Sequence, residues 1–267
     1  MTTKPRHVLS LSGGKDSTAL AIYMRDRVPE MEYVFCDTQK ELVETYEYLS
    51  RIEAYLGKPV VRLSSAEDGG RGFDHHLEMY RGYLPSPRMR WCTRKLKIEP
   101  FEQYIGDAPV LLYIGIRGDE NREGYISTKP NITPVYPFKT DGIVKADVFR
   151  ILQDSGLGVP EYYEWRTRSG CYFCFYQRKI EWVGLLEKHP DLFQKAIEYE
   201  RPEEGYTWVQ KESLAELAKP ERVAQIKKEE AVRREREKAN RKPRTLAEAF
   251  GGEIAEDDSD GCTICHL

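Results

Sequence analysis

Short apolar segments alternate with longer segments of helical periodicity over the first part of the chain. The apolar segments lie at residues 7–11, 33–36, 59–63 and 110–116, and the helical patterns at residues 17–27, 40–56 and 94–104. Strands that alternate with helices are typical of a doubly wound parallel sheet. We therefore predict an α/β fold, in which ligands bind beyond the carboxyl ends of the strands.

The pattern changes after residue 130, where aromatic residues become frequent and further helical patterns lie at residues 144–155, 179–188 and 191–200. After Trp208 the chain becomes highly charged: the segment from Glu221 to Arg244 contains ten Lys or Arg and five Glu. We interpret this segment as a solvated, salt-bridged helix or, alternatively, as a helix that lies along nucleic acid. The predicted parts are a sheet domain at residues 1–130, a helical aromatic layer at residues 131–208, and a charged helix with a flexible tail at residues 209–267.

Composition adds a cellular setting to this picture. The 267 residues carry a net charge of -3, so any surface for nucleic acid must be local. No apolar run approaches the roughly 20 residues of a membrane helix, and the first residues lack the pattern of a signal peptide, so we expect a cytoplasmic protein without a membrane partner. In that reducing compartment the six cysteines are better suited to metal binding or redox chemistry than to disulfides.

The segment "SGGKDST", residues 12–18, joins the first apolar run to the first helical pattern. Gly13 and Gly14 permit a tight turn that exposes backbone N–H groups at a helix N-terminus, which is a site for anions. Lys15 adds positive charge, and three hydroxyls add donors. The spacing is not that of a Walker-type loop. A turn without a ligand would explain the glycines but not the lysine and hydroxyls, so we predict a phosphate site.

This segment resembles the PP-loop of the adenine-nucleotide alpha-hydrolase superfamily, whose members act at the alpha phosphate of ATP or of an adenylyl compound. Three further segments resemble motifs of the phosphoadenosine phosphosulfate reductase family: "FCDTQKELVET" from Phe35, "RWCTRKLKIEP" from Arg90 and "GIRGDENR" from Gly115. Gln39 stands where that family often has glycine. The four motifs span about 120 residues in the family's order. The resemblance implies a PP-loop fold, an enzyme, and ATP or adenylyl sulfate with Mg²⁺ as its cofactors.

The resemblance also implies site residues. The nucleotide would contact Ser10, Ser12, Gly13, Gly14, Lys15, Asp16, Ser17, Asp37, Thr38, Gly115 and Arg117. The catalytic set would be Lys15, Asp16, Arg117 and Arg122, whose arginines neutralise phosphate charge as it builds during cleavage. The alternative for both arginines is a surface salt bridge to Asp119, Glu120 or Glu123.

Cys171 and Cys174 form a C-x-x-C pair, whose spacing lets two thiolates hold one metal or cluster. In related sulfur-transferring enzymes, such a pair joins a cysteine at the position of Cys92 to hold a [4Fe–4S] cluster, with Cys262 or Cys265 as a candidate fourth ligand. Alternatives are a zinc site completed by Cys262 and Cys265, a plain redox pair, or buried cysteines without chemistry. Cys36 lies in an apolar run and is predicted to be a core thiol.

The context of the C-x-x-C pair resembles the ATP-pyrophosphatase subunits of bacterial DNA phosphorothioation systems. This predicts an AMP- and pyrophosphate-forming sulfur-transfer enzyme that thiolates nucleic acid. Its partners would be an adenine nucleotide, nucleic acid, a cysteine desulfurase or other sulfur donor, and further subunits. One alternative is an adenylyl- or phosphoadenylyl-sulfate reductase with a C-terminal cysteine nucleophile. The other is a nucleotide-binding zinc module without catalysis.

Overall fold

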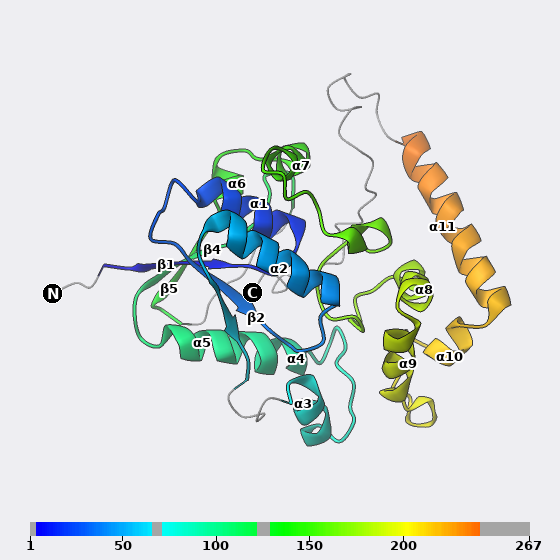
Figure 1. The fold of residues 1–267 in the computed structure, drawn as a ribbon. Coiled ribbons are helices and arrows are strands. Elements are labelled where there is room, and N and C mark those ends of the chain that lie inside the picture. Colours follow the sequence, from blue (N-terminus) through cyan, green and yellow to red (C-terminus); the bar gives the residue numbers. More distant parts are fainter. Residues whose placement is uncertain (1–3, 66–70, 122–128, 241–267) are drawn as a thin grey trace.

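The computed structural model describes residues 4–65, 71–121 and 129–240 (Figure 1). Its centre is a five-stranded parallel sheet in the order β3-β2-β1-β4-β5. The strands are β1 (Arg6–Ser10), β2 (Glu32–Cys36), β3 (Val60–Leu63), β4 (Val110–Tyr113) and β5 (Ile132–Val135). The predicted doubly wound α/β fold is thereby confirmed.

Helices cover both faces of the sheet because its strands are apolar on both sides. In β1 the buried Val8 and Leu9 belong to two different hydrophobic clusters, one on each face. One cluster packs α1 (Lys15–Met24), α2 (Val43–Leu56), α6 (Pro137–Thr140) and α7 (Lys145–Asp154) on the sheet, and the other packs α5 (Glu99–Ile105) on the opposite face (Figure 1). Such two-sided burial is what a parallel sheet requires.

The predicted strands and helices of the first 115 residues are present, but helix α3 (Phe73–Met79) was not predicted, and the segment before α5 is more complex than expected. The helical pattern at residues 94–104 divides into a short helix α4 (Trp91–Thr93), a π-helical turn at Arg94–Ile98, and α5, which has Pro100 in its first turn. Proline there cannot donate to the preceding turn. Strand β5 was not predicted, since Pro134 interrupts its four residues, and it is at the sheet edge that proline is tolerated. The sheet thus extends past residue 130, where we expected its domain to end.

A second layer packs beside the carboxyl end of the sheet. It contains α3 (Phe73–Met79), α8 (Lys179–Lys188), α9 (Pro190–Glu198), α10 (Leu214–Leu217) and α11 (Pro220–Asn240), with 3-10 turns at Glu161–Glu164 and Pro202–Glu204. Its core is aromatic: the ring of Phe173 stacks on Trp208 at 4.9 Å and lies 4.4 Å from Phe73. Of the helices expected between residues 131 and 208, α8 and α9 lie in this layer, whereas α7 packs on the sheet.

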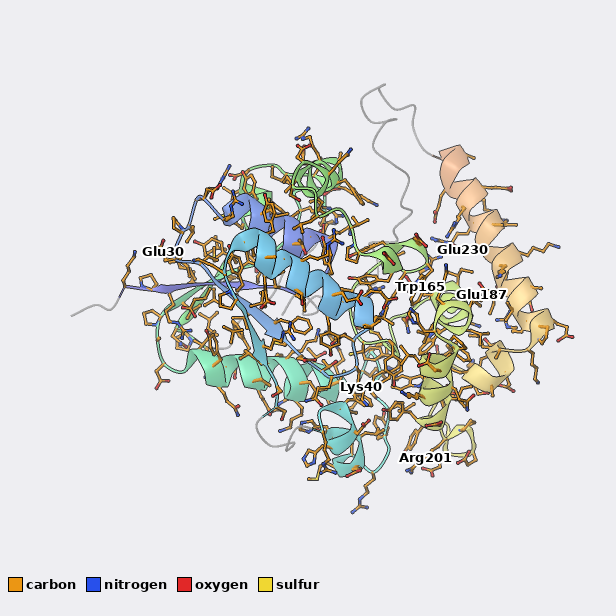
Figure 2. The ribbon with its side chains drawn as sticks, viewed as in Figure 1. Glu30, Lys40, Trp165, Glu187, Arg201 and Glu230 are labelled. Atoms are coloured by element: carbon orange, nitrogen blue, oxygen red, sulfur yellow. The ribbon has the colours of Figure 1, made fainter. Side chains whose placement is uncertain are left out.

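Helix α11 is held along α8 by ion pairs and a few apolar contacts. Ile226 is buried, Lys227 binds Glu187 of α8 at 2.6 Å, and Glu230 binds Arg178 (Figure 2). The structure thus shows α11 as a salt-bridged helix, which was the first of the two interpretations of the charged segment. In the ranges that the structure describes, no helix is long and apolar enough to cross a membrane.

Candidate active site

The phosphate loop lies at the carboxyl end of the central strand β1, between Ser10 and the start of α1 at Lys15. Gly13 has φ +72°, and a Cβ there would lie 2.8 Å from Cγ2 of Thr45. A Cβ at Gly14 would lie 2.7 Å from Oγ of Ser169. Both glycines are therefore required, one by its backbone conformation and both by close neighbours.

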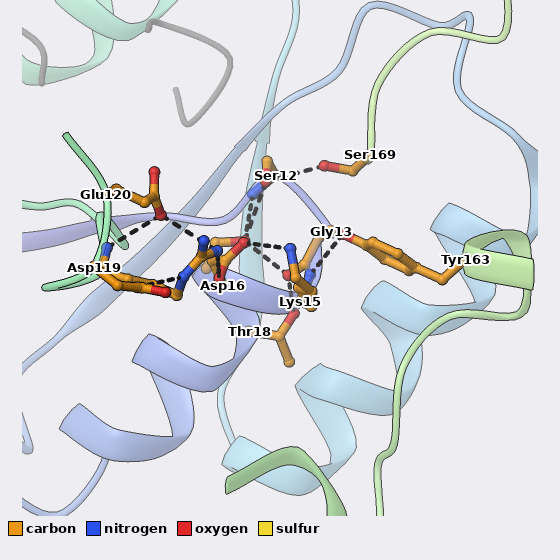
Figure 3. Close-up of polar contacts among 12 residues, drawn as sticks. Ser12, Gly13, Lys15, Asp16, Thr18, Asp119, Glu120, Tyr163 and Ser169 are labelled. Atoms are coloured by element: carbon orange, nitrogen blue, oxygen red, sulfur yellow. Dashed lines mark hydrogen bonds and ion pairs between the residues drawn. The ribbon is translucent and has the colours of Figure 1, made fainter. Parts of the chain in front are cut away.

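A buried charge cluster lies in the first turn of α1 (Figure 3). Asp16 accepts hydrogen bonds from Nζ of Lys15 and from Nη1 of Arg117, each at 2.9 Å. Burial alone would raise the pKa of Asp16, but the charges and hydrogen bonds of Lys15 and Arg117 outweigh it and hold that pKa well below its usual range. Asp16 therefore holds two cations together at the loop.

Arg117 is 1% exposed and contacts three carboxylates. Besides Asp16, its Nε donates to Asp119 at 3.0 Å, and its Nη1 lies 3.3 Å from Glu120. Of the salt bridges considered from the sequence, those of Arg117 with Asp119 and Glu120 form, but the guanidinium is buried and also joined to the phosphate loop. Gly115 permits this approach, because a Cβ there would lie 3.0 Å from the carbonyl oxygen of Asp16.

The loop hydroxyls are engaged within the loop. Ser17 Oγ accepts the N–H of Ser12 at 3.2 Å and donates to the carbonyl of Gly14 at 3.1 Å, to which Thr18 also donates at 2.8 Å. These contacts fix the turn that presents the backbone N–H groups. Ser10 is buried at the end of β1, directly before the loop.

The motif after β2 lies beside the loop. Asp37 accepts from the N–H of Gln39 and from the hydroxyl of Tyr46, both at 2.8 Å. Gln39 has φ +61°, the left-handed conformation that glycine adopts most easily, which explains the glycine common at this position in the family it resembles. Thr38 donates to Glu41 at 2.6 Å, and its Oγ1 lies 3.1 Å from Sγ of Cys171.

Cys171 and Cys174 share a tight turn, in which the N–H of Cys174 donates to the carbonyl of Cys171 at 3.1 Å. Burial, reinforced by the nearby Glu41 carboxylate, raises the pKa of the Cys171 thiol well above its usual value. Cys92 packs against the same hydrophobic cluster as Cys171. Among the described residues, however, no three His, Cys, Asp or Glu side chains form a group that could hold a metal ion. Two thiols of the predicted cluster are thus adjacent, and the complete ligand set stays a prediction.

Three predicted site residues, Arg122, Cys262 and Cys265, lie outside the described residues. Cys36 is buried in β2, where burial raises its pKa to about 12, in keeping with a core thiol.

The sequence interpretation missed a second set of loop contacts, made by Tyr162, Tyr163 and Ser169. The hydroxyl of Tyr162 donates to the carbonyl of Gly13 at 2.9 Å, and the N–H of Lys15 donates to the hydroxyl of Tyr163 at 3.1 Å. The tyrosine pair was visible in the sequence as part of the aromatic layer, yet nothing in its spacing indicated the loop 149 residues earlier.

Residues 6–139, half of the chain, match the family model of the phosphoadenosine phosphosulfate reductase domain. The chain belongs to this family. The matched range includes the phosphate loop, the motif after β2, Cys92 and Arg117, but not the C-x-x-C pair. The family membership predicted from the motifs is thereby confirmed.

Relatives of this family member extend the similarity beyond the matched domain. Two uncharacterized proteins of Methanocaldococcus jannaschii are 24% and 25% identical to 71% and 76% of this chain. The chain spans less than half of their length, 46% and 44%. An uncharacterized 37.8 kDa protein of Escherichia phage 186 is 25% identical over 73% of this chain and 74% of its own length.

One solved structure supports the fold. The phosphoadenylyl-sulfate reductase of Candida auris, in a phosphate complex, superposes with a TM-score of 0.52 at 14% identity, over 63% of this chain and 82% of that one. The U34-tRNA thiolase NcsA of Methanococcus maripaludis, with its [4Fe-4S] cluster, gives a TM-score of 0.42 at 14% identity, over 75% of this chain and 72% of that one. The second score is too low to support an argument.

Proposed function

We propose that the protein is a sulfur-transfer enzyme that uses an adenine nucleotide, cleaving ATP to AMP and pyrophosphate. The observation that carries the proposal is the 3.1 Å contact between Sγ of Cys171 and Oγ1 of Thr38. It brings a thiol from outside the family domain to the carboxyl edge of β2, beside the phosphate loop. Ligands of doubly wound sheets bind at this edge, so a bound nucleotide and the thiol would be neighbours.

The residues in and around the phosphate loop would have distinct roles in this reaction. The backbone N–H groups at the start of α1 would bind phosphate oxygens, and Lys15 and Arg117 would offset the negative charge that develops as the alpha phosphate is attacked. Asp16 would position both cations. Asp37 and Thr38 would contact the adenosine. Mg²⁺ would arrive with the nucleotide, since this ion is held largely by substrate phosphates.

The sulfur chemistry would take place at the C-x-x-C turn. Cys171 and Cys174, with Cys92, are the proposed ligands of a [4Fe–4S] cluster, and Cys262 or Cys265 is the proposed fourth. Such a cluster, when bound, would hold the sulfur to be transferred; a zinc ion in its place would make the site structural. A thiol loses its proton when it binds a metal, and the burial that raises the pKa of Cys171 would oppose that loss.

The acceptor is proposed to be nucleic acid, with a cysteine desulfurase or other cytoplasmic donor supplying sulfur and further subunits completing the enzyme. The basic side chains of α11 give this part limited support, because Arg222, Lys227 and Arg233 are each paired with glutamate. Such pairing leaves less charge for phosphates.

The second candidate is a reductase of adenylyl or phosphoadenylyl sulfate, which the family match favours. A cysteine thiolate would attack the sulfur and release the nucleotide, and a second thiol would then release sulfite and leave a disulfide. The third candidate is a nucleotide-binding zinc module without turnover.

One set of measurements on anaerobically purified protein separates the three candidates. Iron content with AMP and pyrophosphate release from ATP supports sulfur transfer; sulfite release from adenylyl sulfate with a thiol reductant supports the reductase; zinc without turnover supports the binding module. Protein that neither binds nor cleaves any of these nucleotides would refute all of them.

Two lysine variants tie turnover to the loop. Lys15→Ala should weaken nucleotide binding by about 1.5–3 kcal/mol, the usual contribution of a charged hydrogen bond. The matched control is Lys58→Ala. The ammonium group of Lys58 donates to the backbone carbonyls of Pro29 and Met31 near the amino ends of β2 and β3, away from the phosphate loop. Equal affinity in the two variants would contradict the assignment of the loop.

A further inference from the structure

One segment of the chain, residues 162–171, contacts the phosphate loop at one end and carries the Cys171 thiol at the other. At the loop end, Tyr162 donates to the carbonyl of Gly13 as described above. Figure 3 shows the other two contacts: Tyr163 accepts from the N–H of Lys15, and Ser169 Oγ donates to Oγ of Ser12 at 3.3 Å. At the thiol end, Cys171 lies against Thr38. This segment lies outside the matched family domain.

Arg166 joins the two ends: its backbone N–H donates to the carbonyl of Tyr162 at 2.9 Å, and its side chain reaches the thiol turn. Its side chain is 1% exposed, yet its Nη1 donates to the carbonyl of Gly170 at 3.0 Å and its Nη2 to the carbonyl of Cys171 at 2.9 Å. A guanidinium group is a rigid fork, so two adjacent carbonyls bound to it are fixed in relative position. Its Nε is buried without a hydrogen-bond partner in the part of the chain described, and such a cost is accepted where a side chain is held for a specific geometry.

The contact between segment and loop leaves no spare room. A Cβ on Gly14 would lie 2.7 Å from Ser169 Oγ and 3.2 Å from the hydroxyl of Tyr163. The N–H of Lys15 now donates to that tyrosine hydroxyl, and a phosphate oxygen bound at the start of α1 would compete for it. A phosphate that took this N–H would displace the hydroxyl of Tyr163, and close-packed interiors transmit such shifts.

We propose that Arg166 is a positioning residue that couples the phosphate loop to the thiol turn, so that nucleotide binding changes the backbone protection of residues 171–174. The inference rests on the nucleotide binding of the proposed function and adds a regulation of the same site. Because coupling is reciprocal, whatever fixes the thiol turn also changes nucleotide affinity.

Hydrogen exchange of the full chain, read by mass spectrometry with and without ATP, tests the coupling. In the wild type we expect exchange to change in the loop peptide, residues 12–18, and by about threefold or more in the turn peptide, residues 169–176. In Arg166→Lys, the loop peptide should still respond and the turn peptide should respond much less, since an ammonium group on a flexible stem lacks the rigid fork that fixes the two carbonyls relative to each other. This split between two peptides is not expected of a residue that only stabilises the fold.

Two further variants keep the test decisive. Tyr163→Phe retains the ring that stacks on Tyr162 at 5.0 Å but removes the hydroxyl, and it should reduce the response of the turn even if Arg166→Lys folds poorly. Arg51→Lys is the matched control: Arg51 also donates to a backbone carbonyl, that of Leu157, at 2.7 Å, and should leave both responses unchanged.

The outcomes separate this inference from the proposed function. Two results would overturn the coupling alone. In one, ATP changes exchange in the loop peptide of the wild type but not in the turn peptide. In the other, the turn peptides of Arg166→Lys and Tyr163→Phe both respond to ATP as the wild type does. A loop that responds to neither ATP nor adenylyl sulfate would overturn nucleotide binding, and the coupling with it.

Discussion

Replacing Asp16 by asparagine removes the central anion of the buried charge cluster while keeping the shape of the side chain. Asp16 is 8% exposed and accepts hydrogen bonds from Lys15 and Arg117. Removing one partner of a buried ion pair typically costs about 3–5 kcal/mol, because the remaining charge stays buried. Arg117 keeps Asp119 and Glu120, so we expect Asp16→Asn to lower the free energy of unfolding by about 2–4 kcal/mol at pH 7.

The effect should depend on pH in one direction. The pKa of Asp16 is lowered in the folded protein, so its contribution is complete above the unfolded value of about 3.9 and is lost as pH falls below it. The difference between wild type and Asp16→Asn should therefore be flat from pH 8 to 5 and shrink below about pH 4.

Urea unfolding followed by tryptophan fluorescence measures this difference. The matched control is Asp26→Asn, because Asp26 lies on the surface, where it pairs with Arg25. It should unfold at the same urea concentration as the wild type. If Asp16→Asn also did so, the buried cluster would contribute nothing to stability, and the reasoning would be refuted.

Two further substitutions test local features. Gln39→Val should lower the free energy of unfolding by about 1–3 kcal/mol in urea titrations, because a β-branched residue fits the φ of +61° poorly. Gln39→Gly should not lower it, and equal losses in the two variants would argue against the backbone explanation. Glu230→Gln should lower it by about 1–3 kcal/mol and speed proteolysis within α11, while Glu235→Gln should do neither. Although burial opposes it, ion pairs with Arg233, Arg178 and Arg234 lower the pKa of Glu230 to about 2, so its contribution is present above the unfolded value of about 4.3 and lost as pH falls toward 2. Stability of Glu230→Gln that matched the wild type at pH 7 would contradict this account.

The sequence alone determined most of the sheet and the phosphate loop. Residues such as Val8 and Leu9 are apolar on successive positions because a parallel sheet is buried on both faces, and that signal is local. The glycines, lysine and hydroxyls of residues 12–18 also act within one turn, so their order predicts a phosphate site before any packing is known. Strand β5 escaped prediction because Pro134 is acceptable only at an edge, and no local pattern says which strand lies at the edge.

The tertiary structure decided what surrounds the loop. Thr38 and Cys171 are separated by 133 residues, and Tyr163 lies 148 residues from the backbone N–H that it accepts. Arg166 could be read in the sequence only as one charge among many, since its partners are backbone carbonyls. Such contacts arise when the aromatic layer packs against the carboxyl end of the sheet, and the energy of that packing depends on surfaces brought together from the whole chain. Local patterns therefore determine the phosphate loop, and only the packing of the two layers places a thiol beside it.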